Sequence, residues 1–576
     1  MNRAKFPLLL FFIGLFTTAS AQKTVFELSN GKKTATYFQV IDFYKGLTRQ
    51  SSKIKMVEKG LTDAGYPLHV VMIDNEGVFD PVKWHQQKKV VIMINNGIHP
   101  GEPDGIDASM MLVRDFAAGK FKLPGNVALA FIPVYNIGGF LNRQQLTRIS
   151  QDGPEEYGFR GNAQNYDLNR DFTKGDTRNS RSWAEIFHWL NPDIMIDNHV
   201  SDGADYQYVI TLISTQYDKL GGSLGEWMRN QFDPGVYEKM KERGQEMYPY
   251  VAVEGSDPSV GFGMFYDSPR YSTGYAALFG TIAYMPETHM LKPYKDRVYA
   301  TFDLMQVIIG EAARKGNDLI RERQKALQDK LTQTEFPLGW RMDRSQYKML
   351  TFRGYEAGRK ESGVSPLPVL FFDRTKPFSK EINHYETYLP LNIIKKPRAY
   401  IIPQGWWKVI ELLRLNQIKM ERLPKDTQIA VTVYHIESLS SMPNAYEGHH
   451  RNSQVKVKAS QEKAQFLKGD YVIQTNQPGN RFLVEMLEPT GDDSYFSWNF
   501  FDPILQRKEG YTQYRWNDQA VEFLRNNPDV KERFDEKMRT DSVFSKNLGQ
   551  QLNFIFINSP YYEKAYMRYP VYRVEP

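Results

Sequence analysis

The feature that most constrains the fold is an alternation of short apolar runs with amphipathic segments in the N-terminal half of the chain. Some runs are apolar almost throughout, as expected for strands covered on both faces: residues 90–94, 127–134, 194–196 and 281–285. Other segments repeat apolar side chains at helical spacing: residues 106–117, 183–190 and 296–332. Strands that alternate with amphipathic helices predict an α/β fold, here a mixed, mostly parallel sheet covered by helices.

The C-terminal part of the chain, after residue 336, has a different pattern of residues. Short runs rich in β-branched and aromatic residues are separated by Pro, Gly and Asn: residues 369–372, 399–402, 429–434, 455–458 and 471–473. One helix is expected among them, from Trp406 to about Leu415. A chain of 576 residues is too long for one ordinary hydrophobic core. We therefore expect an α/β domain over residues 22–335 and a β-rich accessory region over residues 336–576.

The N-terminus has the pattern of a secretory signal peptide. Arg3 and Lys5 give a positive start, residues 8–16 are apolar, and the Ala-Ser-Ala sequence at residues 19–21 ends the run with small side chains. This pattern predicts that residues 1–21 are removed on export. The apolar run is about half of the ~20 residues that span a bilayer, and no later stretch is long and apolar enough. We therefore expect an exported mature chain without a transmembrane segment.

Composition excludes several classes of site and partner. The chain has no cysteine, which rules out disulfides, thiolate metal sites and cysteine nucleophiles. An exported chain without cysteine fits a bacterial periplasm or exterior better than a eukaryotic secretory route. The net charge of +6, from 73 basic and 67 acidic residues, is small and scattered, which argues against a nucleic-acid partner. None of these features sets the oligomeric state.

Residues with metal-binding and acid–base chemistry follow three of the predicted strands. The first strand leads into His99 and Glu102, and the third leads into His199. The fourth strand runs into Glu287. Because the carboxyl ends of parallel strands meet at one edge of a sheet, these side chains can converge there. Imidazole and carboxylate groups are suitable zinc ligands, and a catalytic zinc site uses three of them. The pattern indicates a metal-dependent hydrolase.

With these motifs the chain resembles the zinc carboxypeptidase A family of metallopeptidases over about residues 50–310. The His-Pro-Gly-Glu sequence at residues 99–102 matches the family's His-x-x-Glu zinc motif. Residues 165–172, Asn-Tyr-Asp-Leu-Asn-Arg-Asp-Phe, match its Asp-x-Asn-Arg segment. His199 matches the distant third zinc ligand, and Glu287 matches the catalytic glutamate. The resemblance does not extend to the C-terminal half.

The resemblance implies a zinc centre with a glutamate base. His99, Glu102 and His199 would bind one zinc ion per chain. Glu287 would be the general base that takes a proton from zinc-bound water and returns it to the leaving amine. Asp167 would orient His99.

The resemblance also implies a way to hold the substrate. Asn169 and Arg170 would bind the terminal carboxylate of a peptide, because a planar guanidinium makes paired hydrogen bonds to a carboxylate. Arg160 is our candidate for the arginine that stabilises the oxyanion, and Arg143 and Arg148 are alternatives.

Two positions depart from the family pattern. Many members carry an arginine inside the zinc motif, where this chain has Gly101, so one possible substrate-binding cation is missing. The mobile active-site tyrosine of the family has no unambiguous match. Tyr271 is our first choice for it, and Tyr266 and Tyr275 are alternatives.

The function implied by the resemblance is that of an exported zinc metallocarboxypeptidase that hydrolyses C-terminal peptide bonds. Its partner would be a peptide substrate with a free C-terminal carboxylate. One alternative is a zinc-dependent amidase or endopeptidase that acts on cell-wall peptides. Another is a non-catalytic, peptide-binding surface protein. We interpret His289 as a packing or hydrogen-bonding residue, and His449 and His450 as loop residues without a role.

Overall fold

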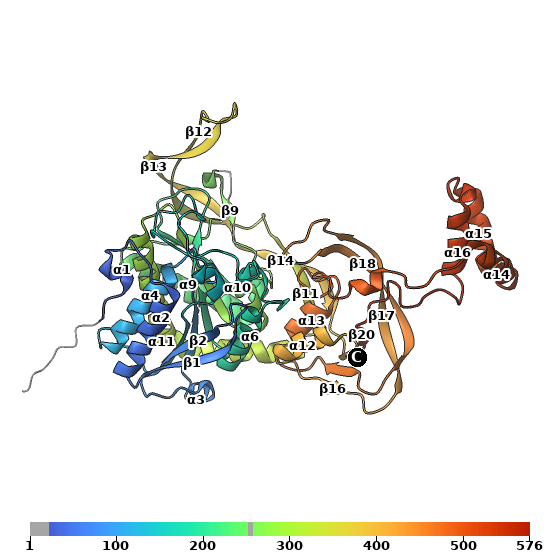
Figure 1. Ribbon diagram of the computed structural model, residues 1–576, viewed down its shortest axis with the longest axis horizontal. Helices are drawn as coiled ribbons and strands as arrows, with labels where there is room; N and C mark the ends of the chain where they lie inside the picture. The colour runs from blue at the N-terminus through green and yellow to red at the C-terminus, as the bar shows by residue number, and fades with distance from the viewer. Residues whose placement is uncertain (1–21, 252–256) are drawn as a thin grey trace, which may run out of the picture.

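The computed structural model describes residues 22–251 and 257–576 (Figure 1). The predicted signal peptide, residues 1–21, lies outside the described residues. None of the helices in these two ranges combines the length and the apolar composition of a transmembrane segment.

A nine-stranded mixed sheet forms the centre of the N-terminal half. Its strands are β1 (Ile54–Leu61), β2 (Pro67–Ile73), β3 (Val90–Asn95), β4 (Val127–Ile132), β5 (Ile194–Asp197), β6 (His199–Ser201), β7 (Ile210–Ser214), β8 (Tyr248–Pro249) and β10 (Ile282–His289). The order is β1-β2-β4-β3-β5-β10-β7-β8, and β6 pairs with β10. The central strands β4, β3, β5 and β10 are mutually parallel, so their carboxyl ends share one edge. The predicted mixed, mostly parallel sheet is confirmed.

Helices cover both faces of this sheet. The main ones are α2 (Tyr37–Gln50), α4 (Asp104–Ala117), α6 (Arg178–Leu190), α9 (Asp233–Glu242), α10 (Ser272–Leu278) and α11 (Tyr294–Thr332). Shorter ones are α1 (Val25–Leu28), α3 (Pro81–Gln86), α5 (Ile137–Leu141), α7 (Tyr217–Leu220) and α8 (Gly222–Trp227). The chain moves from β3 outward to β4 and then back to β5. Right-handed crossovers in those two directions place α4 and α6 on opposite faces.

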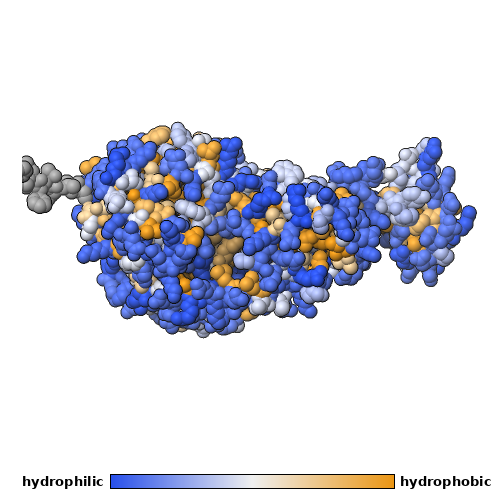
Figure 2. All heavy atoms as spheres, turned by 90° about the horizontal axis from the view of Figure 1, so that it is seen from below, coloured by the Kyte–Doolittle hydropathy of each residue, from blue (hydrophilic) through white to orange (hydrophobic). Residues whose placement is uncertain are grey.

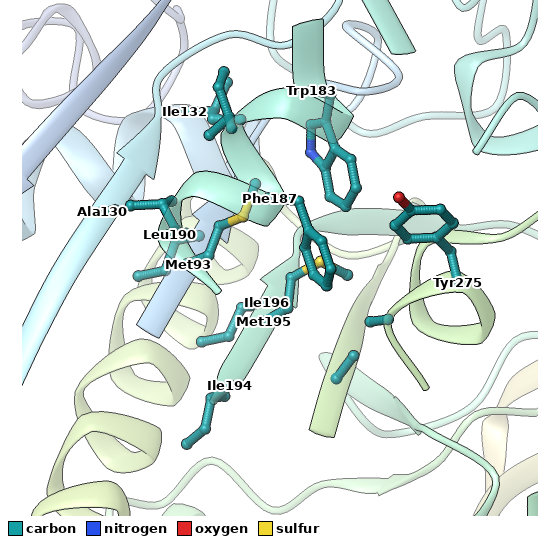
Figure 3. Close-up of a cluster of buried hydrophobic side chains, with 14 of the residues drawn as sticks. Met93, Ala130, Ile132, Trp183, Phe187, Leu190, Ile194, Met195, Ile196 and Tyr275 are labelled. Atoms are coloured by element: carbon teal, nitrogen blue, oxygen red, sulfur yellow. The ribbon is translucent and has the colours of Figure 1, made fainter. Parts of the chain in front are cut away.

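The packing of α6 shows why the apolar strands are buried. Trp183 and Phe187 stack with ring centroids 5.2 Å apart and face Met93, Met195 and Tyr275 (Figure 3). The Thr177 hydroxyl caps the start of α6, and Asn191 ends it in a left-handed conformation with φ of 46°. The helix therefore begins and ends where its apolar stripe meets the sheet.

The accessory region contains three further sheets. The antiparallel strands β11 (Glu335–Met342) and β14 (Tyr388–Lys395) form one. The hairpin of β12 (Lys348–Lys360) and β13 (Val369–Tyr385) forms the next, extended by β9 (Phe262–Gly263). The third has the order β16-β19-β15-β20-β17-β18. Its strands are β15 (Ala399–Ile402), β16 (Glu421–Arg422), β17 (Thr427–Ser441), β18 (Asn452–Phe466), β19 (Tyr471–Gln474) and β20 (Tyr572–Val574). The predicted β-rich character is confirmed.

The accessory region also contains helices, several of which the sequence analysis did not anticipate. The expected helix is α12 (Trp407–Leu415), and α13 (Asn480–Leu487) is buried along its length. The remaining helices, α14 (Gln513–Asn526), α15 (Pro528–Thr540) and α16 (Leu548–Ile557), form a separate unit at the far end of the molecule (Figure 1). That unit has its own small core around Trp516 and Phe556.

The accessory region and the α/β domain share one hydrophobic core. Phe336, Tyr400 and Phe482 belong to the same buried cluster as the central strands. The short strand β9 of the α/β domain pairs with the end of β13. Figure 2 shows hydrophilic residues over most of the face seen from below, with apolar residues gathered in smaller groups. The two parts are therefore packed against each other and are not joined by a free linker.

Candidate active site

The residues singled out at the strand ends converge at the carboxyl edge of the sheet. His99 and Glu102 lie in the turn after β3, where the Glu102 N–H donates to the His99 carbonyl at 2.9 Å. His199 begins β6, directly after β5. Glu287 lies in β10 opposite His199. Because β3, β5 and β10 are adjacent and parallel, their ends carry these side chains to one place.

His99, Glu102 and His199 form a candidate metal centre. One donor atom from each lies within 4.8 Å of the other two, and all three side chains are buried. His99 Nδ1 lies 3.3 Å and His199 Nδ1 lies 3.2 Å from Glu102 Oε2. Two imidazole nitrogens and a carboxylate oxygen are the donors that zinc takes in catalytic sites.

The second nitrogen of each imidazole is also held in place. His99 Nε2 lies 2.9 Å from Asp167 Oδ1, and His199 Nε2 lies 3.1 Å from Asp197 Oδ2. Carboxylates in this position fix the ring orientation of metal-ligating histidines and leave the other nitrogen free to bind the metal. The donor set therefore fits a zinc ion on both chemistry and orientation.

The charges around Glu102 favour a cation beside it. Burial opposes ionisation of Glu102, but His99 and Arg148 hold its pKa well below the usual range. Burial alone would lower the pKa of His199, but the Asp197 carboxylate outweighs it and raises that pKa to about 10. The site thus stabilises positive charge next to Glu102, where a metal ion would bind.

Glu287 stands on the wall of a pocket of about 350 Å³ that also contains the three candidate ligands. Its side chain is only 8% exposed. Burial, opposed by His199, raises the pKa of its carboxyl group to about 8. A carboxyl group with a pKa near neutrality can both accept and return a proton.

Asn169, Arg170 and Tyr271 line the same pocket. Asn169 Oδ1 accepts a hydrogen bond of 3.2 Å from the Ser272 N–H, which ties the Asp-x-Asn-Arg segment to the start of α10. The Arg170 guanidinium lies over the Tyr271 ring, 4.7 Å from its centroid. A cation and hydrogen-bond donors therefore stand on the wall of the pocket beside the candidate metal centre.

The structure distinguishes between Arg143, Arg148 and Arg160, the three candidates for the oxyanion-stabilising arginine. Arg160 and Arg148 both line the pocket, and Arg148 Nη1 donates to Glu102 Oε1 at 2.7 Å. Arg143 instead donates to the backbone carbonyls of Thr34 and Ala35, away from the pocket. Two arginines are thus placed at the site.

Gly101 explains how Arg148 reaches Glu102. A Cβ atom on Gly101 would lie 2.7 Å from Arg148 Cδ, so the missing side chain makes room for this arginine. Sequence reasoning took Gly101 as the loss of a cation. The structure shows that a cation from a distant loop lies against that position.

The structure also distinguishes between the three candidate active-site tyrosines. Tyr266 stacks on Tyr388 with ring centroids 5.7 Å apart. Tyr275 is fully buried and donates to Asn416. Neither lines the pocket, whereas Tyr271 does.

His289 and His449, to which the sequence analysis assigns no catalytic role, both have definite partners. His289 is fully buried, with Nε2 at 2.9 Å from the Ala204 carbonyl. His449 Nε2 lies 2.7 Å from Asp176 Oδ2, a contact between the accessory region and the α/β domain. The expectation that His449 has no role is wrong, and no pattern in the sequence indicates this partner, because the two residues lie 273 positions apart.

A second cavity, of about 360 Å³, adjoins the pocket. The two share Ile213, Tyr250 and Phe265. Residues of β7, β8 and α9, among them Tyr237 and Tyr248, line it together with residues of β12 and β13. The accessory region therefore supplies part of its wall, and the sequence alone gave no sign of this.

Comparison with known proteins agrees with this geometry. The profile of the zinc carboxypeptidase family matches residues 40–229. Residues 40–229 therefore form a zinc carboxypeptidase domain. Carboxypeptidase 2 of Trichophyton rubrum is 20% identical over 476 residues, which cover 79% of this chain and 82% of that protein. The probable carboxypeptidase 2 of Arthroderma benhamiae is 20% identical over 444 residues, or 73% of this chain and 77% of that one.

Solved structures of carboxypeptidases also align with part of the chain. The metallo-carboxypeptidase from Burkholderia cenocepacia aligns with a TM-score of 0.36 and 15% identity, over 48% of this chain and 69% of that one. Carboxypeptidase A from Helicoverpa armigera aligns with a TM-score of 0.38 and 14% identity, over 49% of this chain and 74% of that one.

Proposed function

We propose that this zinc carboxypeptidase family member removes the C-terminal residue of peptides by zinc-dependent hydrolysis. The observation that carries the proposal is one pocket that holds three metal donor atoms within 4.8 Å, a buried glutamate and Arg170. His99, Glu102 and His199 would hold the zinc. When bound, zinc supplies a Lewis acid and brings the pKa of water from 15.7 toward about 7.

The protein's own residues would then perform the proton transfers. In the proposal, a Glu287 carboxylate oxygen accepts a proton from the attacking water and passes it to the nitrogen of the leaving amine. Arg160 and Arg148 stand on the pocket wall, where they can stabilise the negative charge that develops on the carbonyl oxygen. Asp167 holds the His99 ring through Nε2.

The substrate would be anchored by its terminal carboxylate. Asn169 and Arg170 bind that carboxylate in the proposal, and Tyr271 packs beneath the guanidinium. The side chain of the last residue would enter the adjoining cavity, whose exposed lining is mainly apolar. Export of the chain remains part of the proposal and rests on residues 1–21.

The test compares one peptide with a free and with an amidated C-terminus, with and without a chelator. We expect hydrolysis of the free peptide alone, lost on chelation and restored by zinc. Equal hydrolysis of both peptides would instead favour an amidase or endopeptidase. Binding without hydrolysis by zinc-loaded protein would favour a peptide-binding protein, and hydrolysis that resists the chelator would reject the metal mechanism.

A further inference from the structure

A tight turn of the accessory region reaches the segment that carries Asn169 and Arg170. The turn spans residues 446–449, in the connection between β17 and β18. The Tyr446 N–H donates to the His449 carbonyl at 2.8 Å, and the His449 N–H donates back at 3.1 Å. Glu447 and Gly448 have φ angles of 50° and 77°, the left-handed pair of a narrow hairpin turn.

Three contacts join this turn to the α/β domain. Arg170 Nε donates to the Tyr446 hydroxyl at 3.0 Å. The Asp167 N–H donates to Glu447 Oε2 at 2.9 Å. The third contact is the 2.7 Å pair between His449 and Asp176. The turn therefore holds both ends of the segment from Asp167 to Arg170, across 276 to 280 positions of sequence.

These contacts fix the plane of the Arg170 guanidinium. Nε is engaged by Tyr446, and Nη1 donates to the Asn169 carbonyl at 2.9 Å. Among the described residues, Nη2 has no hydrogen-bond partner. Nη1 also lies 3.8 Å from Asp167 Oδ2, beyond hydrogen-bond distance. One proton on Nη1 and both on Nη2 therefore remain without a hydrogen bond, at the end of the guanidinium that pairs with a carboxylate. Tyr271 covers one face of the group at 4.7 Å.

The Tyr446 ring is itself held in place. It stacks on Trp498 with ring centroids 6.1 Å apart and planes 16° apart. Trp498 is fully buried in the accessory region. Nearby, Arg270 Nη2 pairs with Asp493 Oδ1 at 2.9 Å, a second link between the two parts of the chain. The hydroxyl thus sits on a rigid support, which a positioning group requires.

We propose that Tyr446 of the accessory region is a positioning residue that orients Arg170 toward the terminal carboxylate of the substrate. This inference rests on the proposed function, because it gives Arg170 a carboxylate to bind. It assigns the turn at residues 446–449 a part in substrate recognition. Tyr446 acts through Arg170, since Tyr446 does not line the pocket.

The experiment uses the full, zinc-loaded enzyme and the Tyr446→Phe variant, which removes only the hydroxyl. With a free-carboxylate peptide we expect KM to rise about 5- to 20-fold while kcat stays within about twofold, because one hydrogen bond to a charged group is lost. We expect inhibition by a released product, free L-phenylalanine, to weaken by a similar factor. Gly448→Ala should act in the same direction, because its Cβ would lie 2.6 Å from the Tyr166 hydroxyl.

A matched control is available within the accessory region. The Tyr471 hydroxyl accepts a 2.7 Å hydrogen bond from Arg422, away from the pocket, so Tyr471→Phe removes the same kind of contact. We expect its KM to match the unsubstituted enzyme. An unchanged KM in folded Tyr446→Phe overturns the positioning role. If the unsubstituted enzyme does not prefer the free carboxylate, the proposed function itself fails, and this inference fails with it.

Discussion

Two buried titratable residues of β10, Glu287 and His289, lie in different surroundings. Glu287 lines the pocket, whereas His289, two positions later, is enclosed by protein. Burial raises the pKa of Glu287 to about 8 and lowers that of His289 to about 4. In both cases burial disfavours the charged form. The same physical effect would suit Glu287 to the proposed proton transfer and keeps His289 neutral.

The Glu287→Gln variant tests the proposed base. The amide keeps the size of the side chain but cannot accept a proton at neutral pH, so we expect kcat to fall at least about 100-fold. Zinc content should be retained, because Glu287 is not among the three donors. Metal analysis and steady-state kinetics check this, and near-normal kcat would remove Glu287 as the base.

His289 makes stability depend on pH in a definite direction. Its Nδ1 accepts from the Leu291 N–H at 3.1 Å, so a proton there would meet another donor. Because its pKa is lower in the folded state than the ordinary 6.5, its contribution is complete above pH 6.5 and is lost as the pH falls toward 4.

We therefore expect the thermal unfolding midpoint to decrease as the pH is lowered from 7 to 5. The fall should be smaller in His289→Gln, which keeps one donor and one acceptor without titrating. Equal pH dependence in the two proteins would show that His289 does not contribute.

At the scale of the element, helix α4 packs closely against the residue that follows β5. A Cβ atom on Gly105 would lie 2.4 Å from Asn198 Cβ and 2.6 Å from Asn96 Oδ1. Arg297 on α11 ties the start of the helix by donating to Asp104 at 3.1 Å. This close approach brings the turn that carries Glu102 against the residue before His199. The candidate metal centre thus depends on a glycine within a helix.

Gly105→Ala and Gly310→Ala should have opposite effects. Alanine normally stabilises a helix by about 0.5–1 kcal/mol over glycine, and we expect that gain at exposed Gly310, where nothing lies within 4 Å. At Gly105 we expect a loss of about 1–3 kcal/mol from overpacking. Denaturant unfolding of both variants measures this, and stabilisation by Gly105→Ala would contradict the packing described here.

At the scale of the whole molecule, the accessory region contributes residues to the adjoining cavity and to the surroundings of the pocket. The adjoining cavity is lined by Leu212 and Tyr248 of the α/β domain and by Leu350 and His384 of the accessory region. The turn at residues 446–449 contacts Asp167 and Arg170. Because the two parts also share a core, we infer that they act as one enzyme unit.

The cavity predicts a preference for large apolar C-terminal residues. Burial of each methylene is worth about 0.8 kcal/mol, so kcat/KM should rise by at least ~10-fold from peptides ending in Ala to those ending in Leu or Phe. Leu350→Arg should reduce this preference, while Leu391→Arg, at a 41% exposed position of the same region, should not. Kinetics on a matched peptide series measures it, and a flat series would exclude the cavity as the side-chain site.

The sequence by itself determined the strands, the main helices and the change from an α/β pattern to a β-rich pattern along the chain. Periodicity and apolar runs are local properties, so β3, α4 and α11 lie close to where they were expected. It also indicated His99, Glu102, His199 and Glu287, because each lies at or just beyond a strand of the sheet. Helices α14 to α16 were missed because a small core of their own leaves most of their surface polar.

Only the tertiary structure decided which arginines and which tyrosine reach the pocket. Arg148 enters through the space left by Gly101, and Tyr271 rather than Tyr275 faces the pocket. It alone brought Tyr446 to Arg170. These contacts join loops whose meeting depends on how helices and sheets pack in space, and spacing along the chain carries no record of that packing.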